Sequence, residues 1–317
     1  MMQPSGELWF LCNGISRPAA TAKRCLKCGT SRDRLQRFMA SIFNKLFRSG
    51  GAKGLPSLPT GRRVYAIGDI HGRLDLLAEL AEAIEQDDNA RCSAETTVIL
   101  LGDLVDRGPD SRGVIEFARK WAMLRDLRFI SGNHEEMFLS AFTEQGKFRG
   151  FMRFGGVQTL ASYGLDASEL IDTDFAEVTH RLKRAVPEAH RDFMRSFETS
   201  IVMGDYLFVH AGIYPGVPVD QQHPHDCRWI REPFLSHKGD LGFMVVHGHT
   251  VTEQAELRDH RIGIDTGAFD SGVLTALCLE GTGRRLLQTE DRGGHIEIHE
   301  RPANCAEDFE LMVPGSL

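Results

Sequence analysis

Three short blocks in the first half of the chain combine residue types suited to phosphate chemistry. They are Gly68-Asp69-Ile70-His71-Gly72, Gly102-Asp103-Leu104-Val105-Asp106-Arg107-Gly108 and Gly132-Asn133-His134-Glu135. Each block follows an apolar run of strand length and is bounded or opened by glycine. Carboxylate and amide oxygens and imidazole nitrogens bind divalent metals, and arginine binds phosphate oxygens with two hydrogen bonds. The blocks therefore predict a site for metal ions and a phosphate group.

The spacing within the first two blocks favours two metal ions rather than one. Residues i and i+2 of an extended segment project to the same side, so Asp69 and His71 can contact one ion. Asp103 follows the next apolar run, and its carboxylate is suited to bridge two ions. Two divalent metals about 3.5–4 Å apart, with an acidified water between them, are a common arrangement for phosphoester hydrolysis.

The second half of the chain repeats the pattern of polar groups after apolar runs. His210 lies in His210-Ala211-Gly212, and His249 lies in His247-Gly248-His249-Thr250. Arg231, in Trp229-Ile230-Arg231-Glu232, offers a second cation for phosphate beside Arg107. Any one of these motifs has an ordinary alternative, such as a turn or a surface ion pair. Five motifs in this order, each after a strand, favour one shared site.

Two polar residues near these motifs have two open interpretations each. His247 either packs in the core or supports a ligand from behind. Asp265, in Ile264-Asp265-Thr266-Gly267, either orients a metal ligand or caps a turn.

The elements that must position these residues follow an order of strand, polar group and helix. We expect strands at 62–67, 97–101, 127–130, 206–209 and 243–246. The run at 97–101 has no polar alternation, which is typical of a strand covered on both faces in an α/β fold. Ligands in such folds bind at the carboxyl ends of the strands. The sequence therefore predicts a layered α/β domain with its site at that edge.

Composition narrows the class of protein. The 317 residues are 42% hydrophobic and 26% charged, as in ordinary globular proteins. No apolar run is long enough for a membrane span, and the first residues lack the pattern of a secretory signal. Seven scattered cysteines argue against a disulfide framework and show no nucleophile motif. We predict a cytoplasmic protein that does not bind nucleic acid, because the domain has no basic stripe interleaved with aromatic residues.

The N-terminal region differs from the rest in charge. Residues 1–61 hold ten Lys and Arg against two Asp and Glu, whereas the remaining residues hold 27 against 42. Apolar residues at helical spacing over 35–48 predict a basic amphipathic helix, which either packs on protein or makes weak peripheral contact with an acidic membrane. Translation from Met39, which would make residues 1–38 a mis-assigned start, is an alternative. Cys25-x-x-Cys28 lacks the second pair of ligands that a structural zinc site needs.

The expected organisation has three parts. Residues 1–61 are a basic extension that ends in a linker at 54–61, residues 62–300 are the catalytic domain, and residues 301–317 are a loose tail. Within the domain, residues 138–200 form a helical insert. This insert either shapes the substrate surface or packs simply as helices.

The five motifs, in this order and without substitution, resemble the phosphoprotein phosphatase branch of the calcineurin-like metallophosphoesterases. The likeness covers about residues 62–279 and is greatest to the compact bacterial and phage members typified by the phage lambda phosphatase. It implies a four-layer α-β-β-α sandwich with two central mixed sheets. The chain lacks the SAPNY block of eukaryotic relatives, so regulatory subunits are not implied.

The resemblance implies a role for each matching position. One metal would be held by Asp69, His71 and Asp103. The other would be held by Asp103, Asn133, His210 and His249. His134 would be the general acid, oriented by Asp106. The phosphoryl oxygens would be bound by Arg107, Arg231 and Asn133. Mn²⁺ is the preferred metal, and iron and zinc also suit these ligands.

The implied activity is removal of phosphate from phosphoserine and phosphothreonine in proteins, and also from phosphotyrosine, by direct attack of a hydroxide between the metals. The alternative is a symmetrical dinucleoside tetraphosphate hydrolase. Those relatives usually carry VARG where this chain has VDRG, so Asp106 favours the phosphatase. A non-catalytic scaffold that binds phosphorylated partners is a third hypothesis. The full set of ligands together with His134 counts against it.

Overall fold

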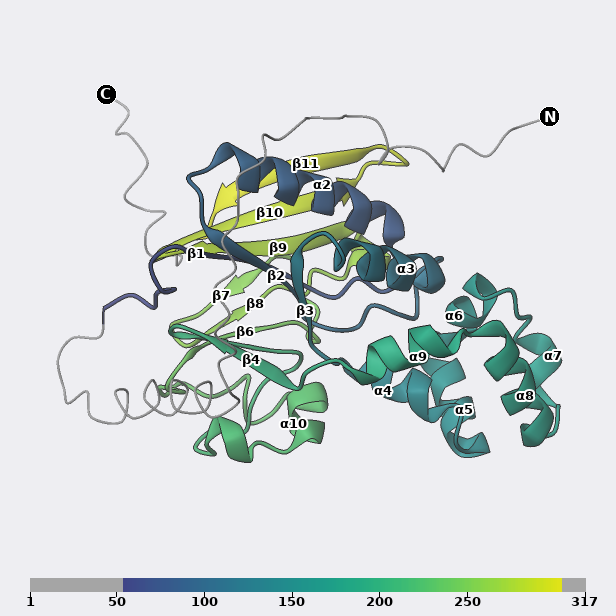
Figure 1. Ribbon diagram of the computed structural model, residues 1–317. Coiled ribbons are helices and arrows are strands. Elements are labelled where there is room, and N and C mark those ends of the chain that lie inside the picture. Colours follow the sequence, from purple (N-terminus) through teal and green to yellow (C-terminus); the bar gives the residue numbers. More distant parts are fainter. Residues whose placement is uncertain (1–53, 304–317) are drawn as a thin grey trace, which may run out of the picture. The chain divides into compact units, whose positions relative to one another are not determined.

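The computed structural model describes residues 54–303. Two β-sheets form the centre of this part of the chain (Figure 1). The first has six strands in the order β11-β10-β9-β1-β2-β3, and the second has five in the order β4-β5-β6-β8-β7. The expectations for the helix at 35–48, the start at Met39 and the Cys25-x-x-Cys28 pair lie outside the described residues.

Each sheet combines parallel and antiparallel strands. The six-stranded sheet is built from β1 (Arg62–Ile67), β2 (Glu95–Leu100), β3 (Asp126–Phe129), β9 (Val273–Glu280), β10 (Gly283–Asp291) and β11 (Ile296–Pro302). The five-stranded sheet is built from β4 (Ser200–Met203), β5 (Tyr206–Val209), β6 (Met244–His247), β7 (Glu256–Leu257) and β8 (Arg261–Gly263). The strands β1, β2 and β3 are parallel to one another, as are β5, β6 and β8. The remaining pairings are antiparallel.

Helices cover the outer faces and connect the strands. The α-helices are α2 (Leu74–Ala90), α3 (Ser111–Trp121), α4 (Asn133–Ser140), α5 (Gln145–Phe151), α6 (Val157–Ser162), α7 (Ser168–Ile171), α8 (Phe175–Ala185), α9 (Glu188–Arg195), α10 (Pro224–Trp229) and α11 (Ala268–Ser271). A short π-helix, η1 (Met152–Gly156), joins α5 to α6, and a 3₁₀ turn, η2 (Val219–Gln221), precedes α10.

Alternation along the strands creates three apolar layers. In β1, Val64 and Ala66 pack between the two sheets, whereas Tyr65 and Ile67 pack under α2 and α3. In β5, Phe208 joins the core between the sheets, and Leu207 packs against the segment that contains α10. Since successive side chains of a strand point to opposite faces, each sheet is buried on both sides. The result is the predicted four-layer α/β arrangement with two mixed sheets.

The strand positions predicted from the sequence agree with the structure within two residues at each end. β1 and β5 have the predicted bounds, and β2, β3 and β6 are displaced by one or two residues. No helix among residues 54–303 is both long and apolar enough to cross a membrane.

The segment expected to be a linker is partly folded onto the sheets. Leu58 is only 4% exposed and belongs to the core between the sheets. Its amide donates to the carbonyl of Gly281, and Ser57 donates to the carboxylate of Asp205 from both its amide and its hydroxyl. At the other end, β11 continues to Pro302, because its pairing with β10 extends that far. Packing thus extends the domain beyond 62–300 on both sides.

The insert between β3 and β4 consists of α4 to α9, which Figure 1 shows as a group of helices (teal) beside β3. Its apolar side chains, among them Phe151, Leu160 and Leu182, continue the core that lies under α2 and α3. Non-helical backbone at Val186 and Pro187 separates α8 from α9, since proline lacks the amide that would continue the helix.

Leu58→Ala should reduce the free energy of unfolding by about 2 kcal/mol or more, because it removes a buried side chain from the core between the sheets. Leu55→Ala is a matched control, since Leu55 is 71% exposed and three residues away. Denaturant unfolding of both variants is the measurement. Equal stability of the two would contradict the packing of this segment.

Candidate active site

The predicted site residues meet where parallel strands of the two sheets end. Asp69 and His71 follow β1, Asp103 follows β2, and Asn133 opens α4 after β3. His210 follows β5, and His249 lies two residues beyond β6. Parallel strands end at one edge of a sheet, so the polar segments of each sheet gather there. The described structure thus brings the six predicted metal ligands into one buried region.

Backbone strain is concentrated in this region. Within residues 54–303, the non-glycine residues with positive φ are His71 (46°), Asp103 (50°), Asp106 (73°), Arg107 (68°) and His249 (64°). All five were predicted from the sequence as site residues. Such conformations cost on the order of 1–3 kcal/mol each and persist only where the surroundings enforce them. The site is therefore a rigid part of the fold that its neighbours hold in place.

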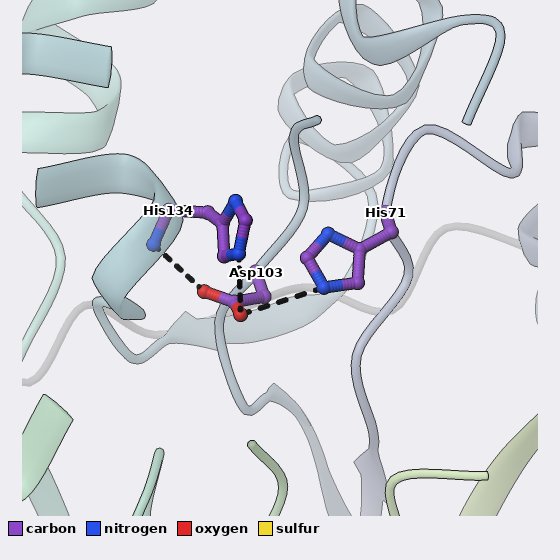
Figure 2. Close-up of side chains that lie close together, drawn as sticks. All are labelled: His71, Asp103 and His134. Atoms are coloured by element: carbon purple, nitrogen blue, oxygen red, sulfur yellow. Dashed lines mark hydrogen bonds and ion pairs between the residues drawn. The ribbon is translucent and has the colours of Figure 1, made fainter. Parts of the chain in front are cut away.

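Asp103 lies at the centre of the site, and its carboxylate is 2% exposed. Figure 2 shows the imidazoles of His71 and His134 on either side of it. Oδ2 lies 3.5 Å from His71 Nε2 and 3.9 Å from His134 Nε2, and Oδ1 lies 3.4 Å from His210 Nε2. One carboxylate thus faces groups from both sheets, as a bridging ligand must.

The surroundings of Asp103 require a close approach of the next loop. The amide of His134 donates to Asp103 Oδ1 over 3.0 Å. A Cβ on Gly132 would lie only 2.1 Å from the same oxygen. A side chain at position 132 would therefore overlap the carboxylate of Asp103, so glycine is the residue that fits there.

His71 presents a bare nitrogen to Asp103. Its Nδ1 donates to the carbonyl of Val105 over 2.7 Å, which leaves Nε2 as a lone pair in the neutral ring. Burial lowers the pKa of His71 to about 3, so the ring stays neutral. Nε2 is buried and has no hydrogen-bond partner among the described residues. The lone pair of His71 Nε2 and the carboxylate of Asp103 therefore face each other with no hydrogen between them. This arrangement suits a metal ion that both groups would bind.

The same argument applies to the second cluster. His210 Nδ1 donates to the carbonyl of Leu101 over 2.8 Å, so its Nε2 is a lone pair as well. That nitrogen lies 2.9 Å from Asn133 Oδ1, and His249 Nδ1 lies 3.0 Å from the same oxygen. Ligands of one ion, each about 2.1 Å from it, are about 3.0–3.4 Å apart. The donor set of Asp103, Asn133, His210 and His249 therefore fits a divalent cation.

Electrostatics favour a cation over protons at this site. Burial lowers the pKa of His249 to about 3, and the charge of the neighbouring His210 acts in the same direction. Burial also lowers the pKa of His210. Neutral imidazoles bind metals, and the carboxylates supply the compensating negative charge.

Asp69 lies beside this centre and adds to its negative charge. Both its oxygens accept the amide of His249, at 3.2 and 3.1 Å. Burial, together with the carboxylates of Asp265 and Asp103, raises the pKa of Asp69 well above its usual value. A nearby cation would relieve that repulsion. In the compact cluster around His71, however, the third close group is His134 rather than the predicted Asp69.

Asp106 and His134 form a buried pair next to the metal ligands. His134 Nδ1 lies 2.7 Å from Asp106 Oδ2, and both side chains are at most 1% exposed. Burial alone would lower the pKa of His134, but the carboxylates of Asp103 and Asp106 outweigh it and raise the pKa. The guanidinium of Arg107 lies 3.0 Å from the other ring nitrogen, Nε2. The pair thus has the geometry of an acid held by a carboxylate.

Arg231 and its neighbours approach the site from the five-stranded sheet. Arg231 is exposed, and its charge contributes to the lowered pKa of His249. Just before it, Arg228 and Trp229 donate to the carboxylate of Glu136 over 2.9 and 2.8 Å. Since Glu136 belongs to α4, these bonds tie the segment of Arg231 to the helix that carries Asn133 and His134. The sequence analysis did not predict this link.

Glu135 is a further structural member of the site that sequence reasoning missed. Its buried carboxylate accepts the amides of Asp103, Leu104 and Gly132 over 2.7–2.9 Å. Burial and the charge of Asp103 raise the pKa of Glu135 to about 7. The only sequence signal was a glutamate at the third position of a helix, where it can accept amides of the preceding loop.

The two residues with open interpretations are both buried. His247 packs edge-on against Phe234, and its Nδ1 lies 3.0 Å from the carbonyl of Gly248, so it belongs to the core behind the site. Asp265 accepts a hydrogen bond from the amide of Gly267 over 3.0 Å, and its negative charge contributes to the raised pKa of Asp69. Asp265 thus caps the turn at Gly267.

Comparison with known proteins identifies the family. The model of the calcineurin-like phosphoesterases matches residues 62–266. The chain is 35% identical over 219 residues to serine/threonine-protein phosphatase 1 of Salmonella typhimurium, covering 68% of this chain and 90% of that protein. It is 26% identical over 234 residues to the asymmetrical bis(5'-nucleosyl)-tetraphosphatase PrpE of Bacillus velezensis, covering 66% and 86%. A solved structure described as a candidate diadenosine tetraphosphatase has a TM-score of 0.49 at 20% identity, covering 78% and 100%.

The fold and the match to the family model define a metallophosphoesterase. The chain belongs to the calcineurin-like phosphoesterase family, since the family model covers more than half of it. Its general activity is hydrolysis of phosphoesters with divalent metals.

Asp103→Asn should abolish binding of both metals, because the amide loses the charge that faces both clusters. Metal analysis of the purified protein is the measurement, with the exposed Asp166→Asn as control. Wild type and the control should retain two ions per chain. A D103N protein that still holds two ions would place the bridging ligand elsewhere.

Proposed function

We propose that this phosphoesterase removes phosphate from phosphoserine and phosphothreonine residues of proteins, and also from phosphotyrosine. The observation that carries the proposal is the buried Asp106–His134 pair, 2.7 Å apart, beside the carboxylate of Asp103. An alkoxide leaving from a serine or threonine is a strong base and needs a proton. A positioned histidine supplies one, which contributes about 10²–10⁴-fold to the rate.

His134 would act through its Nε2 atom. His134 Nδ1–H donates a hydrogen bond to Asp106, so the acid form carries its transferable proton on Nε2, which faces the site. This nitrogen lies 3.0 Å from Arg107 Nη2. Binding of a phosphoryl group would attract Arg107 to the phosphate oxygens and free Nε2 for the leaving oxygen. The negative charge of Asp106 would stabilise the imidazolium until the proton is transferred.

The phosphoryl group would be held by two arginines near the ligands. Arg107 packs over the ring of Phe269, with 4.7 Å from the guanidinium carbon to the ring centroid, which orients it. Arg231 supplies a second positive charge, and Asn133 an amide. Two divalent ions, when bound, would polarise the phosphoryl oxygens and acidify the attacking water.

The cysteines of the described residues support direct hydrolysis over a covalent cysteine mechanism. Cys227 and Cys278 are buried, which raises the pKa of their thiols to about 11 and about 12. A thiol with so high a pKa is a poor nucleophile at neutral pH. Cys92 is exposed and lies outside the motifs of the site.

The substrate class is the open choice within the family. The 35% identity to the Salmonella serine/threonine phosphatase supports a phosphoprotein substrate. The resemblance to the PrpE protein makes asymmetrical dinucleoside tetraphosphate hydrolysis the main rival. Asp106 argued only against the symmetrical hydrolases, so it does not discriminate against this rival. The complete ligand set disfavours a scaffold without catalytic activity.

We propose Mn²⁺ as the metal in both positions, with iron or zinc as the alternatives that metal analysis distinguishes. Carboxylate and amide oxygens suit Mn²⁺, whereas imidazole suits all three metals.

His134→Asn should lower kcat on a phosphoserine peptide by about 10²–10⁴-fold, because it removes the proton donor but none of the proposed metal ligands. Metal content should stay near that of wild type. His180→Asn, at an exposed position in α8, is the control. Wild-type kcat in H134N would refute the assigned role.

The substrate is tested by comparing kcat/KM with Mn²⁺ on a phosphoserine peptide and on diadenosine tetraphosphate. We expect faster turnover of the peptide. If only the nucleotide reacts, the protein is a dinucleotide hydrolase and the proposed substrate is wrong. If neither reacts although two metals are bound, the scaffold hypothesis gains support.

A further inference from the structure

The helical insert reaches the acid–base pair through one buried hydroxyl. Thr159, in α6, donates from Oγ1 to Asp106 Oδ1 over 2.6 Å. Asp106 uses its other oxygen, Oδ2, for His134. Each oxygen of this buried carboxylate therefore has its own donor, one from the insert and one from the imidazole.

Hydrogen bonds with the carboxylate and the amide of Asp106 and with the hydroxyl of Ser111 fix the direction in which the Thr159 hydroxyl donates. Thr159 Oγ1 accepts the amide of Asp106 over 2.9 Å, and it lies 2.9 Å from Ser111 Oγ. The single proton of Thr159 is used on Asp106, so Ser111 is the donor in the bond between the hydroxyls. The Asp106 amide also donates to Ser111 Oγ over 3.0 Å. Ser111 and Thr159 are both fully buried, so water cannot replace these bonds.

The insert contacts the same loop at a second point. The amide of Arg107 donates to the carbonyl of Gly155 over 3.1 Å. Gly155 has φ +104°, and a Cβ there would lie 2.7 Å from the amide nitrogen of Arg107. Gly155 and Thr159 thus hold the loop at Asp106 and Arg107, both of which have strained positive φ.

We propose that Thr159 is a positioning residue for catalysis, which acts through Asp106 to align His134, with Ser111 fixing the direction of its hydroxyl. This inference rests on the proposed role of His134 as general acid. It makes α6 part of the catalytic apparatus. Without the bond from Thr159, the carboxylate of Asp106 can rotate, and His134 Nε2 loses its fixed direction towards the leaving oxygen.

The test uses leaving groups that differ in their need for a proton. A phosphoserine peptide leaves as a strongly basic alkoxide, whereas 2,4-dinitrophenyl phosphate releases a stable phenolate that needs little protonation. Misalignment of the acid should slow the first reaction and spare the second. A change in overall folding would slow both.

Thr159→Val keeps the shape of the side chain and removes its hydroxyl. We expect kcat on the peptide to fall about tenfold or more, kcat on 2,4-dinitrophenyl phosphate to change by less than about threefold, and KM to change by less than about twofold. Thr159→Ser restores the hydroxyl and should restore the rate on the peptide. Thr179→Val is the matched control, because Thr179 Oγ1 has no partner among the described residues and lies in the same insert.

Equal losses on both substrates, or no loss on either, would overturn the inference, as would a T159S variant as slow as T159V. Thermal unfolding of each variant shows whether it is folded. If T159V does not fold, Ser111→Ala provides the same comparison and should slow the peptide reaction selectively. Measurement of H134N on both substrates separates the two proposals. If H134N does not slow the peptide reaction selectively, the acid role of His134 fails. If H134N slows the peptide reaction selectively but T159V does not, the positioning role of Thr159 fails.

Discussion

The burial of one carboxylate, Asp103, is the constraint on which the site depends. It lies where loops from both sheets meet, and its oxygens face His71, His134 and His210 within 3.4–3.9 Å. A buried charge must be compensated, and burial keeps His71 and His210 neutral, so these two rings offer lone pairs rather than protons. Divalent ions, when bound, would compensate this charge, since they can be bound by the carboxylate and the imidazoles together.

Holding such a carboxylate in place requires a strained backbone and a rigid frame. Glu135 binds three amides of two different loops, and so fixes the end of β2 against the start of α4. Thr159 and Gly155 hold the following residues from the insert. The cost of the positive φ angles is met by these bonds and by the packing of helices behind them. The insert therefore stabilises the catalytic loop, in addition to any role in shaping the substrate surface.

Members of the family are named for different phosphoesters. The relatives include a protein phosphatase and a dinucleotide hydrolase, and each of them matches about two thirds of this chain. Both substrate classes contain a phosphoryl group, so the groups proposed to bind it do not by themselves choose between them. Discrimination must come from groups that contact the rest of the substrate.

The sequence alone determined the residue types at the strand ends and the positions of the five strands that precede them. Apolar runs and Gly-rich motifs are local signals, so β1 and β5 were located with their observed bounds. The antiparallel half of the six-stranded sheet, the packing of Leu58 and the role of Glu135 were decided by tertiary structure. So was the bond from Thr159 to Asp106, which joins residues 53 positions apart. Such contacts leave no periodic pattern, because they depend on how separate elements pack.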